Sequence, residues 1–409
     1  METGFRMVRL FNRFNFMIPL FTLVVIQAAQ TQPVVGANKF LGNITTSGAV
    51  RDDFGEYWNQ ITGENETKWA SVEGSRDKMN WRGTDSIAAY AEAHGISWKF
   101  HCLIWGSQYP GWINGLSSTE QLEEITEWFD EAAERYPDVQ MIDVINEAYP
   151  SHRPPPYKNA LGGDGSTGFD WIITAFEMAR ERWPHAVLIY NDYNTIEWDS
   201  EVNWMVKLAT ALKEADAPMD AIGVQAHDVC NVSTSKVKDN IDKLAATGYP
   251  IIVSEYDIGR NNDDQQKKIM EEQFTMMWNH PKVAGITYWG YIVGRTWRNG
   301  TGLKHSNGNE RPALTWLMDF VKENPDPPND YLDLIPGLNV GITGPEHFSV
   351  SSTPVPVIPG RCRPEFFDLQ GRVNSSVRII TGQHSPNAPG IVIRREHQDR
   401  SASIRSMVR

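Results

Sequence analysis

The chain has 409 residues, enough for one α/β barrel of about 250 to 300 residues and a smaller unit beside it. Its formal net charge is −13 and its main body has no long basic run, which argues against nucleic acid or another polyanion as a partner. A neutral or uncharged substrate fits this composition better.

The N-terminal segment has the pattern of a secretory signal peptide. Three arginines precede the apolar run from Phe16 to Ile26, and the small pair Ala28 and Ala29 follows it. The alternative is a membrane anchor, but the run is shorter than the roughly 20 residues that span a bilayer. We therefore expect residues 1–29 to be a signal peptide, the protein to be secreted, and the mature chain to have no membrane-spanning segment.

Residues 37–324 alternate short apolar runs with segments of helical period, which is typical of repeated βα units and a parallel sheet. Eight such units predict a closed (β/α)8 TIM barrel. The expected strands are Phe40–Asn43, Gln60–Glu64, Ser97–Leu103, Met141–Asn146, Val187–Asn191, Ala221–Gln225, Pro250–Ser254 and Gly285–Trp289.

The helix between the third and fourth strands has the clearest period. Ser118 with Gln121 three residues later predicts a capping box at its start, and Pro137 predicts its end. The apolar positions that recur at steps of three and four are Leu122, Ile125, Phe129, Ala132 and Tyr136.

After Asn324 the composition changes. Residues 325–364 are rich in proline and predict a linker, and residues 365–409 predict a small basic C-terminal module, expected to be β. The runs Phe366–Arg372 and Gly390–Arg394 resemble the C-terminal sorting domains of secreted bacterial proteins, which would retain the protein at the cell surface. A β-module that only packs, or an unstructured basic end, are the alternatives.

The three cysteines are scattered, without CxxC or Cys/His metal spacing, and predict neither a disulfide framework nor a zinc site. Cys102 and Cys230 both lie in apolar, strand-like runs, where a free buried thiol is expected. A bridge between these two stays open. Cys362 lies in the linker.

Two apolar runs end in a glutamate: Met141 to Glu147 on the fourth expected strand and Ile251 to Glu255 on the seventh. Active groups of such barrels lie at the carboxyl-terminal ends of strands. Glycosidic cleavage needs one acid that protonates the leaving oxygen and one carboxylate that attacks the anomeric carbon. Asp257 shares a face with Glu255 and is placed to orient His227, which in turn orients the nucleophile.

These residues resemble family 10 of the glycoside hydrolases, the endo-xylanases, over roughly residues 40–320. The motifs that carry the resemblance are Glu64–Trp69, His101–Trp105 with Gln108 and Trp112, Asp143–Ala148, Tyr190–Asn194, Gln225–His227, Ser254–Asp257 and the segment from Trp289 to Trp297.

The resemblance implies Glu147 as the acid/base, Glu255 as the nucleophile, Asn146 as a donor to the sugar 2-hydroxyl, and Asp257 in support. It further implies sugar binding by Glu64, Asn65, Lys68, His101, Trp105, Gln108, Tyr193, Gln225, His227, Trp289 and Trp297. The expected function is that of a secreted retaining endo-1,4-β-xylanase, a monomer acting on xylan and xylo-oligosaccharides, without cofactor or metal.

Two positions depart from the family pattern. Gly106 stands where the family commonly has a histidine, and Tyr256 stands where it usually has a leucine. The Gly106 change is expected to open or alter the glycone side of the cleft.

Three other functions remain open on the residues alone. A cellulase or mannanase would use the same two carboxylates. A metal-dependent hydrolase would use His101 and His227 as ligands, although HxH and HExxH spacings are absent. A non-catalytic carbohydrate-binding barrel would have no need of both glutamates.

Overall fold

A computed structural model describes residues 34 and 36–334 of the chain. The expected signal peptide over 1–29, the tail over 365–409, Cys362, and the linker beyond residue 334 lie outside the described residues. Those expectations therefore stay predictions.

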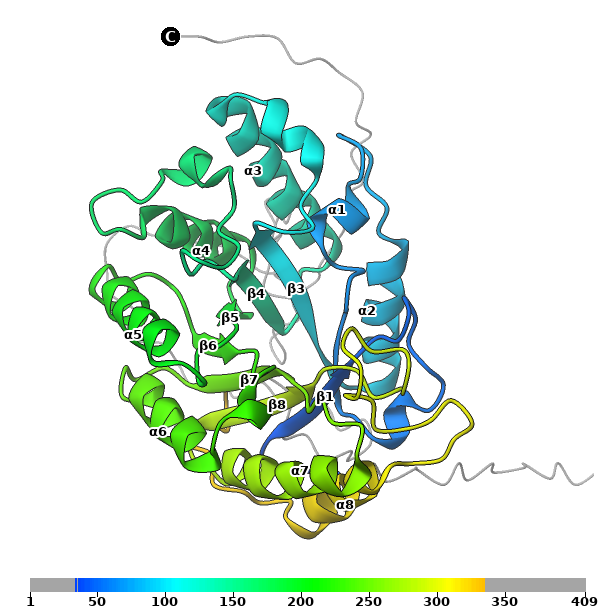
Figure 1. Ribbon diagram of the computed structural model, residues 1–409. Helices are drawn as coiled ribbons and strands as arrows, with labels where there is room; N and C mark the ends of the chain where they lie inside the picture. The colour runs from blue at the N-terminus through cyan, green and yellow to red at the C-terminus, as the bar shows by residue number, and fades with distance from the viewer. Residues whose placement is uncertain (1–33, 35, 335–409) are drawn as a thin grey trace, which may run out of the picture. The chain divides into compact units, whose positions relative to one another are not determined.

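Eight parallel strands close into a barrel in chain order, and β1 pairs with β8 to complete the ring (Figure 1). All eight expected strands are present, so the predicted (β/α)8 barrel is confirmed. The strands are β1 (Phe40–Ile44), β2 (Gln60–Thr62), β3 (Ser97–Trp105), β4 (Met141–Asn146), β5 (Val187–Asp192), β6 (Ala221–Val224), β7 (Ile251–Tyr256) and β8 (Val283–Tyr288).

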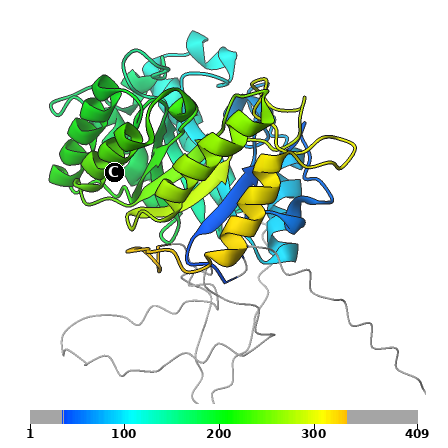
Figure 2. The ribbon, with the colours of Figure 1, turned by 60° about the horizontal axis from the view of Figure 1, so that its bottom comes forward.

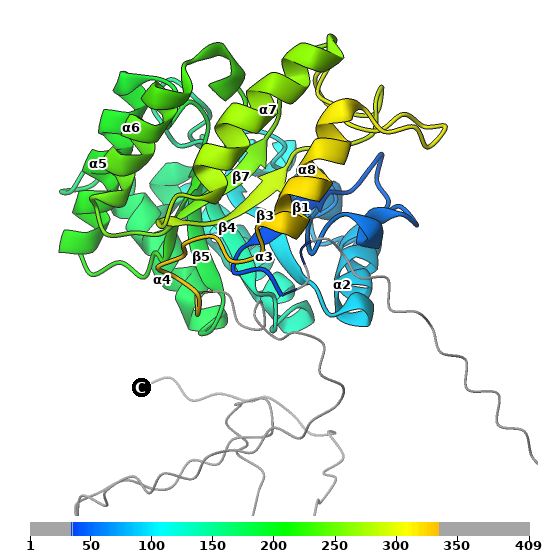
Figure 3. The ribbon, with the colours of Figure 1, turned by 90° about the horizontal axis from the view of Figure 1, so that it is seen from below.

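Helices surround the strands, as Figures 2 and 3 show for α6, α7 and α8. The α-helices are α1 (Trp69–Val72), α2 (Arg82–His94), α3 (Ser118–Arg135), α4 (Asp170–Arg182), α5 (Asp199–Glu214), α6 (Thr234–Ala245), α7 (Asp263–Trp278) and α8 (Pro312–Glu323). Short 3₁₀ turns are η1 (Phe54–Glu56), η2 (Gly111–Gly115), η3 (Lys158–Leu161) and η4 (Val229–Asn231).

The barrel interior changes from apolar to polar along the strands. Met141, Ile189 and Ile252 belong to a buried apolar cluster that is separate from the core under the helices. Two residues further along their strands, Asp143, Asn191 and Ser254 are also fully buried. Alternate residues of a strand share a face. The polar residues therefore lie closer than the apolar cluster to the carboxyl-terminal end of the barrel.

The predicted start of α3 is wrong by one residue. Ser117 is the N-cap, its side chain accepts from the backbone N–H of Glu120, and Glu120 closes the capping box. The backbone of Ser117 is extended, so Ser118 is already the first helical residue. Leu122 is 38% exposed, and the predicted apolar positions left out two buried residues of the helix, Glu124 and Trp128. The helix ends before Pro137, as predicted.

Cys102 and Cys230 are both free. Cys102 is buried in β3, as expected. Cys230 is only partly buried and lies in η4 rather than in a strand, so the expectation of a buried strand thiol is wrong for this residue. Within residues 34 and 36–334, no helix has the length and apolar character that crossing a membrane requires.

Candidate active site

The expected site residues lie at or beyond the carboxyl-terminal ends of the strands, except His101 in the middle of β3. They are Glu64, Asn65 and Lys68 after β2; His101 and Trp105 in β3, with Gln108 beyond it; Asn146 and Glu147 at the end of β4; Tyr193 after β5; Gln225 and His227 after β6; Glu255 in β7, with Asp257 after it; and Trp289 and Trp297 after β8.

Glu255 is a buried carboxylate held on both oxygens. Its Oε1 accepts from Nδ2 of Asn191 at 2.8 Å, and its Oε2 lies 3.2 Å from Nε2 of His227. Burial alone would raise the pKa of Glu255, but the His227 bond and the charge interactions with His101, His227 and Lys99 outweigh it and lower the pKa to about 2. Glu255 is therefore ionised at neutral pH.

His227 is the link between Glu255 and Asp257. Its Nδ1 lies 3.0 Å from Oδ2 of Asp257, while its Nε2 faces Glu255. Burial would lower the pKa of His227, but the two carboxylates prevail and raise it to about 10. The ring is thus a buried cation between two carboxylates, as the sequence predicted for the order Asp257, His227, Glu255.

Glu147 has the opposite electrostatic setting. Its Oε2 accepts from Nε1 of Trp105 at 2.9 Å and its Oε1 from Nε2 of Gln225 at 3.1 Å. Desolvation is the main cause that raises the pKa of Glu147 to about 7, and the negative charges of Glu255 and Asp192 add to it. One carboxyl is thus protonated in part at neutral pH while the other is ionised.

Three side-chain amides connect the two glutamates. Gln225 donates to Glu147 and to Oδ1 of Asn146, at 3.1 and 3.2 Å. Asn191 donates to the same Oδ1 at 3.0 Å and to Glu255 at 2.8 Å. Asn191 was not among the expected site residues. Its place at the end of the fifth strand, within the Tyr190–Asn194 motif, is the signal that identifies it in retrospect.

Asn146 has an unused donor. Its Oδ1 takes both amide bonds, which fixes the side chain so that Nδ2 points elsewhere, and Nδ2 is buried without a hydrogen-bond partner among the described residues. A buried N–H left unpaired costs free energy unless a ligand satisfies it. This donor is therefore available to a bound hydroxyl.

The wall after β2 and β3 is a polar cluster around Lys68. Its Nζ donates to Oδ1 of Asn65 at 3.0 Å and to Oε1 of Gln108 at 2.8 Å, and it lies 5.0 Å from the ring centroid of Trp105. Gln108 also donates to Asn65 at 3.0 Å. Burial lowers the pKa of Lys68. Glu64 is half-buried beside this cluster, and burial, followed by the charge of Glu66, raises its pKa.

Beneath this wall His101 is fixed by residues that the sequence did not single out. Its Nδ1 lies 2.8 Å from Oδ2 of Asp143, and Nζ of Lys99 donates to the same oxygen at 2.7 Å. All three side chains are buried. The pair Lys99 and Asp143 therefore holds the imidazole in one orientation beneath Trp289, whose ring centroid lies 5.4 Å away.

The two tryptophans after β8 differ in exposure. Trp289 is 5% exposed, whereas Trp297 is 50% exposed. The Nε1 of Trp297 donates to Oδ2 of Asp257 at 2.8 Å, so the ring is attached at one end to the carboxylate that pairs with His227 and is open to solvent at the other. An exposed indole beside a cleft offers an apolar face to a sugar ring.

The departure at Gly106 was expected to open or alter the glycone side, and the structure shows no open space beside this residue. A Cβ at this position would lie 2.3 Å from the carbonyl oxygen of Arg153 and 2.5 Å from that of Pro154. The Gly106 N–H donates to the Arg153 carbonyl at 2.9 Å. Backbone of the β4–α4 loop therefore fills the space, and glycine is required because this backbone comes so close.

Among the described residues, one group of three acids has the spacing of a cation site: Glu73, Asp77 and Glu124, with carboxylate oxygens within 4.8 Å of one another. These residues lie at α1 and α3. Arg76 already pairs with Glu124. None of the expected site residues belongs to this group.

Comparisons with known proteins identify the family of the chain. The sequence profile described as glycosyl hydrolase family 10 matches residues 26–320. The chain is 48% identical over 284 residues to endo-1,4-beta-xylanase B of Cellvibrio japonicus, a match that covers 69% of this chain and 46% of that protein. It is 27% identical over 284 residues to endo-1,4-beta-xylanase B of Thermotoga neapolitana, covering 65% and 81%.

Solved structures give the same result for the fold. Native xylanase 10B from Thermotoga maritima superposes with a TM-score of 0.62 at 25% identity, covering 70% of this chain and 95% of that one. Xylanase 10B from Thermotoga petrophila, solved with xylobiose, has the same TM-score, identity and coverage.

Proposed function

The chain belongs to glycosyl hydrolase family 10, and we propose that it is an endo-1,4-β-xylanase that cleaves internal bonds of xylan with retention of configuration. One observation supports this reaction above all: two carboxyl groups in one buried network, with the pKa of Glu147 raised to about 7 and that of Glu255 lowered to about 2. Titratable groups whose environments separate their pKa values take acid and base roles.

In the first step the ionised Glu255 attacks the anomeric carbon through a carboxylate oxygen. The bond from that carbon to the leaving oxygen breaks, and the proton of Glu147 moves to the leaving oxygen. The product of this step is a glycosyl ester on Glu255. The hydrogen bonds from Asn191 and His227 orient the attacking group.

In the second step Glu147 is ionised and accepts a proton from water, which attacks the same carbon from the side that the leaving group vacated. The ester bond breaks and Glu255 is again a carboxylate. Two inversions give net retention. The free Nδ2 of Asn146 suits the sugar 2-hydroxyl, a contact that strengthens in the transition state.

Xylan is proposed as the substrate because the curated relatives are named endo-1,4-beta-xylanases and because the Lys68 cluster matches the glycone-side set of this family. The hydrogen-bond donors and acceptors of Lys68, Asn65 and Gln108 can bind adjacent hydroxyls of a sugar. A cellulase or mannanase remains the competing function. Secretion through residues 1–29, and a monomeric state, are parts of the proposal that rest on the sequence alone.

The test is the hydrolysis of unbranched xylo-oligosaccharides by the purified protein, with product anomers followed by NMR, beside the Glu255→Gln variant. We expect β-anomers first from the wild type and loss of about 10⁴-fold or more in the variant. Parallel assays on carboxymethylcellulose and mannan separate the competing substrates. Initial α-anomers, or an active Glu255→Gln protein, would contradict the assignment.

A further inference from the structure

His152, which the proposed mechanism does not use, lies five residues after Glu147 in the β4–α4 loop. Its Nδ1 is 2.6 Å from Oδ1 of Asp192, and the side chain is only 4% exposed. Its ring stacks on the ring of Tyr193, with centroids 3.5 Å apart and planes 16° from parallel. Tyr149 covers the imidazole further, at a centroid distance of 4.8 Å.

The loop that carries His152 is tied to the acid/base. The Arg153 N–H donates to the carbonyl of Glu147 at 2.8 Å, and the Gly106 N–H donates to the carbonyl of Arg153 at 2.9 Å. The N–H of Tyr149 donates to Oδ2 of Asp192 at 3.1 Å. These bonds leave the imidazole little freedom, because the backbone on both sides of it is held.

Tyr193 is the more exposed of the two stacked rings. It is half-buried, and its hydroxyl has no hydrogen-bond partner among the described residues. Burial, followed by the negative charges of Glu147 and Asp192, raises its pKa to about 12, so the phenol lies within the field of the acid/base. His152 closes one face of the ring, which leaves the opposite face, the edge and the hydroxyl for a ligand.

The position of His152 and Tyr193 on the barrel indicates which sugar of the substrate they contact. The Lys68 cluster lies after β2 and β3, whereas His152 and Tyr193 follow β4 and β5, on the other side of Glu147. The acid that protonates the leaving oxygen stands between the sugar that is retained and the sugar that departs. A residue on the side of Glu147 opposite to the Lys68 cluster therefore faces the departing sugar.

We propose that His152 is a positioning residue for the leaving-group subsite: it holds the Tyr193 ring, through stacking and its bond to Asp192, where that ring binds the departing xylose. This inference rests on the proposed function. It assigns to His152 an effect on kcat/KM for substrates whose leaving group is a sugar. Substrates whose leaving group is not a sugar should be affected less.

The test compares two substrates for the His152→Ala variant: xylotetraose, which places sugars on both sides of the cleaved bond, and 4-nitrophenyl β-xylobioside, whose departing group is a phenolate. We expect the ratio of kcat/KM for xylotetraose to that for the aryl glycoside to fall about tenfold. We expect His152→Asn, which keeps a nitrogen near the place of Nδ1 and a planar group beside Tyr193, to restore part of the ratio.

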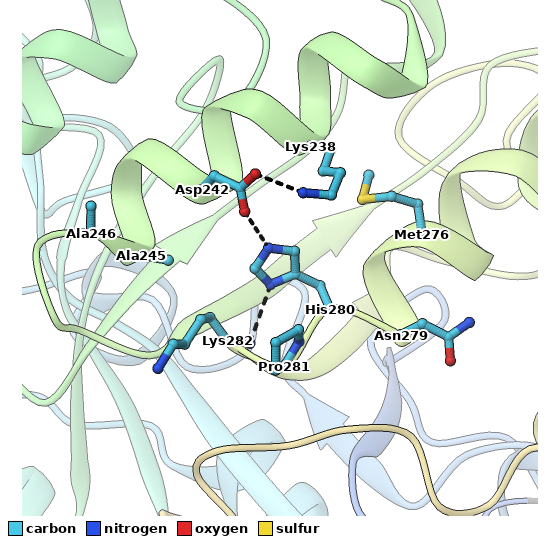
Figure 4. A pocket seen from close by; sticks show the side chains of 9 residues that line it. All are labelled: Lys238, Asp242, Ala245, Ala246, Met276, Asn279, His280, Pro281 and Lys282. Atoms are coloured by element: carbon cyan, nitrogen blue, oxygen red, sulfur yellow. Dashed lines mark hydrogen bonds and ion pairs between the residues drawn. The ribbon is translucent and has the colours of Figure 1, made fainter.

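The control is His280, a buried histidine remote from the site that pairs with the half-exposed carboxylate of Asp242 (Figure 4). Its Nε2 lies 2.8 Å from Oδ1 of Asp242 in α6, its side chain is 6% exposed, and it borders a hollow of about 600 Å³ at the ends of α6 and α7. His280→Ala removes the same kind of bond and should leave the substrate ratio unchanged.

The outcomes are distinguishable. A ratio that falls in His152→Ala but not in His280→Ala supports the inference. A ratio that stays constant in His152→Ala overturns it, even if both rates fall, because a purely structural role affects both substrates alike. If His152→Ala does not fold, His152→Leu, which fills the space without a nitrogen for Asp192, decides by the same ratio. A wild-type protein that cleaves neither substrate would refute the proposed function instead.

Discussion

The imidazole of His227 lies with Nε2 3.2 Å from a carboxylate oxygen of Glu255, the proposed nucleophile. Asp257 on the opposite nitrogen keeps that ring cationic, since it contributes most to raising the pKa of His227 to about 10 against the effect of burial. A buried carboxylate can stay ionised when a buried cation faces it. The low pKa of Glu255 thus depends on its neighbours, with the His227 bond as the largest lowering cause.

Replacing His227 with alanine should therefore move the acid limb of the pH–rate profile to higher pH. The variant loses the hydrogen bond and charge that lower the pKa of Glu255, while the burial that raises it remains. Since Glu255 must be ionised to attack, activity should fall at a higher pH than in the wild type, by about one unit or more. The measurement is kcat/KM on xylotetraose from pH 3 to 9. An acid limb that does not move would show that another group sets it.

The alkaline limb should belong to Glu147. Its pKa is raised to about 7, and it acts first as an acid, so kcat/KM should decrease as pH rises through about 7 and the carboxyl loses its proton. In Glu147→Gln this limb should disappear and the rate on xylotetraose should fall by about 10²- to 10⁴-fold. The loss should be smaller for 4-nitrophenyl β-xylobioside, whose leaving group needs less protonation. Equal losses on both substrates would contradict the acid role.

Asn191 should matter for catalysis although sequence reasoning did not select it. It donates to Glu255 and Asn146, and its Oδ1 accepts from the hydroxyl of Ser254 at 2.6 Å. Removing a hydrogen bond to a charged group costs about 1.5 to 3 kcal/mol. Asn191→Ala should therefore lower kcat on xylotetraose by roughly ten- to a hundredfold.

A suitable control for Asn191 is Asn240→Ala. Asn240 is equally buried, in α6, and donates to the carbonyl of Ile196 at 3.0 Å. This variant should lose stability in denaturant but keep kcat within about twofold. If both variants lose activity in proportion to their stability, Asn191 has only a structural role.

Much of the fold could be predicted because strands buried on both faces are continuous apolar runs. The boundaries were harder. At the start of α3 the tandem Ser117 and Ser118 each have a suitable partner three residues later, Glu120 and Gln121, so the local pattern fits either. The extended backbone of Ser117 decides between them, and that conformation depends on the preceding turn at η2.

The sequence could place Glu147 and Glu255 at the ends of their own strands, and the structure has both there, while their catalytic roles stay predictions. Residues whose part in the site is a contact between strands were missed. Asn191 reaches Glu255 across the barrel mouth, and Asp143 fixes His101 from the neighbouring strand. Such contacts depend on strand register and on the direction of side chains, which one sequence does not specify.

Gly106 gives a final prediction, because here a family departure is explained by packing rather than by an open space. In Gly106→Ala the new Cβ would lie 2.3 Å from the Arg153 carbonyl and 2.5 Å from that of Pro154, so the backbone of the β4–α4 loop must move. Overpacking of this kind costs about 1 to 3 kcal/mol of unfolding free energy. The matched control is Gly111→Ala, where nothing lies within 4 Å of the added Cβ. We expect a lower denaturation midpoint for Gly106→Ala but not for Gly111→Ala.

The kcat of Gly106→Ala on xylotetraose should fall as well, since the displaced loop carries His152 and the N–H of Arg153 that bonds to Glu147. Two variants of equal stability would mean that the loop yields without cost, and that Gly106 does not explain how the cleft is closed on this side.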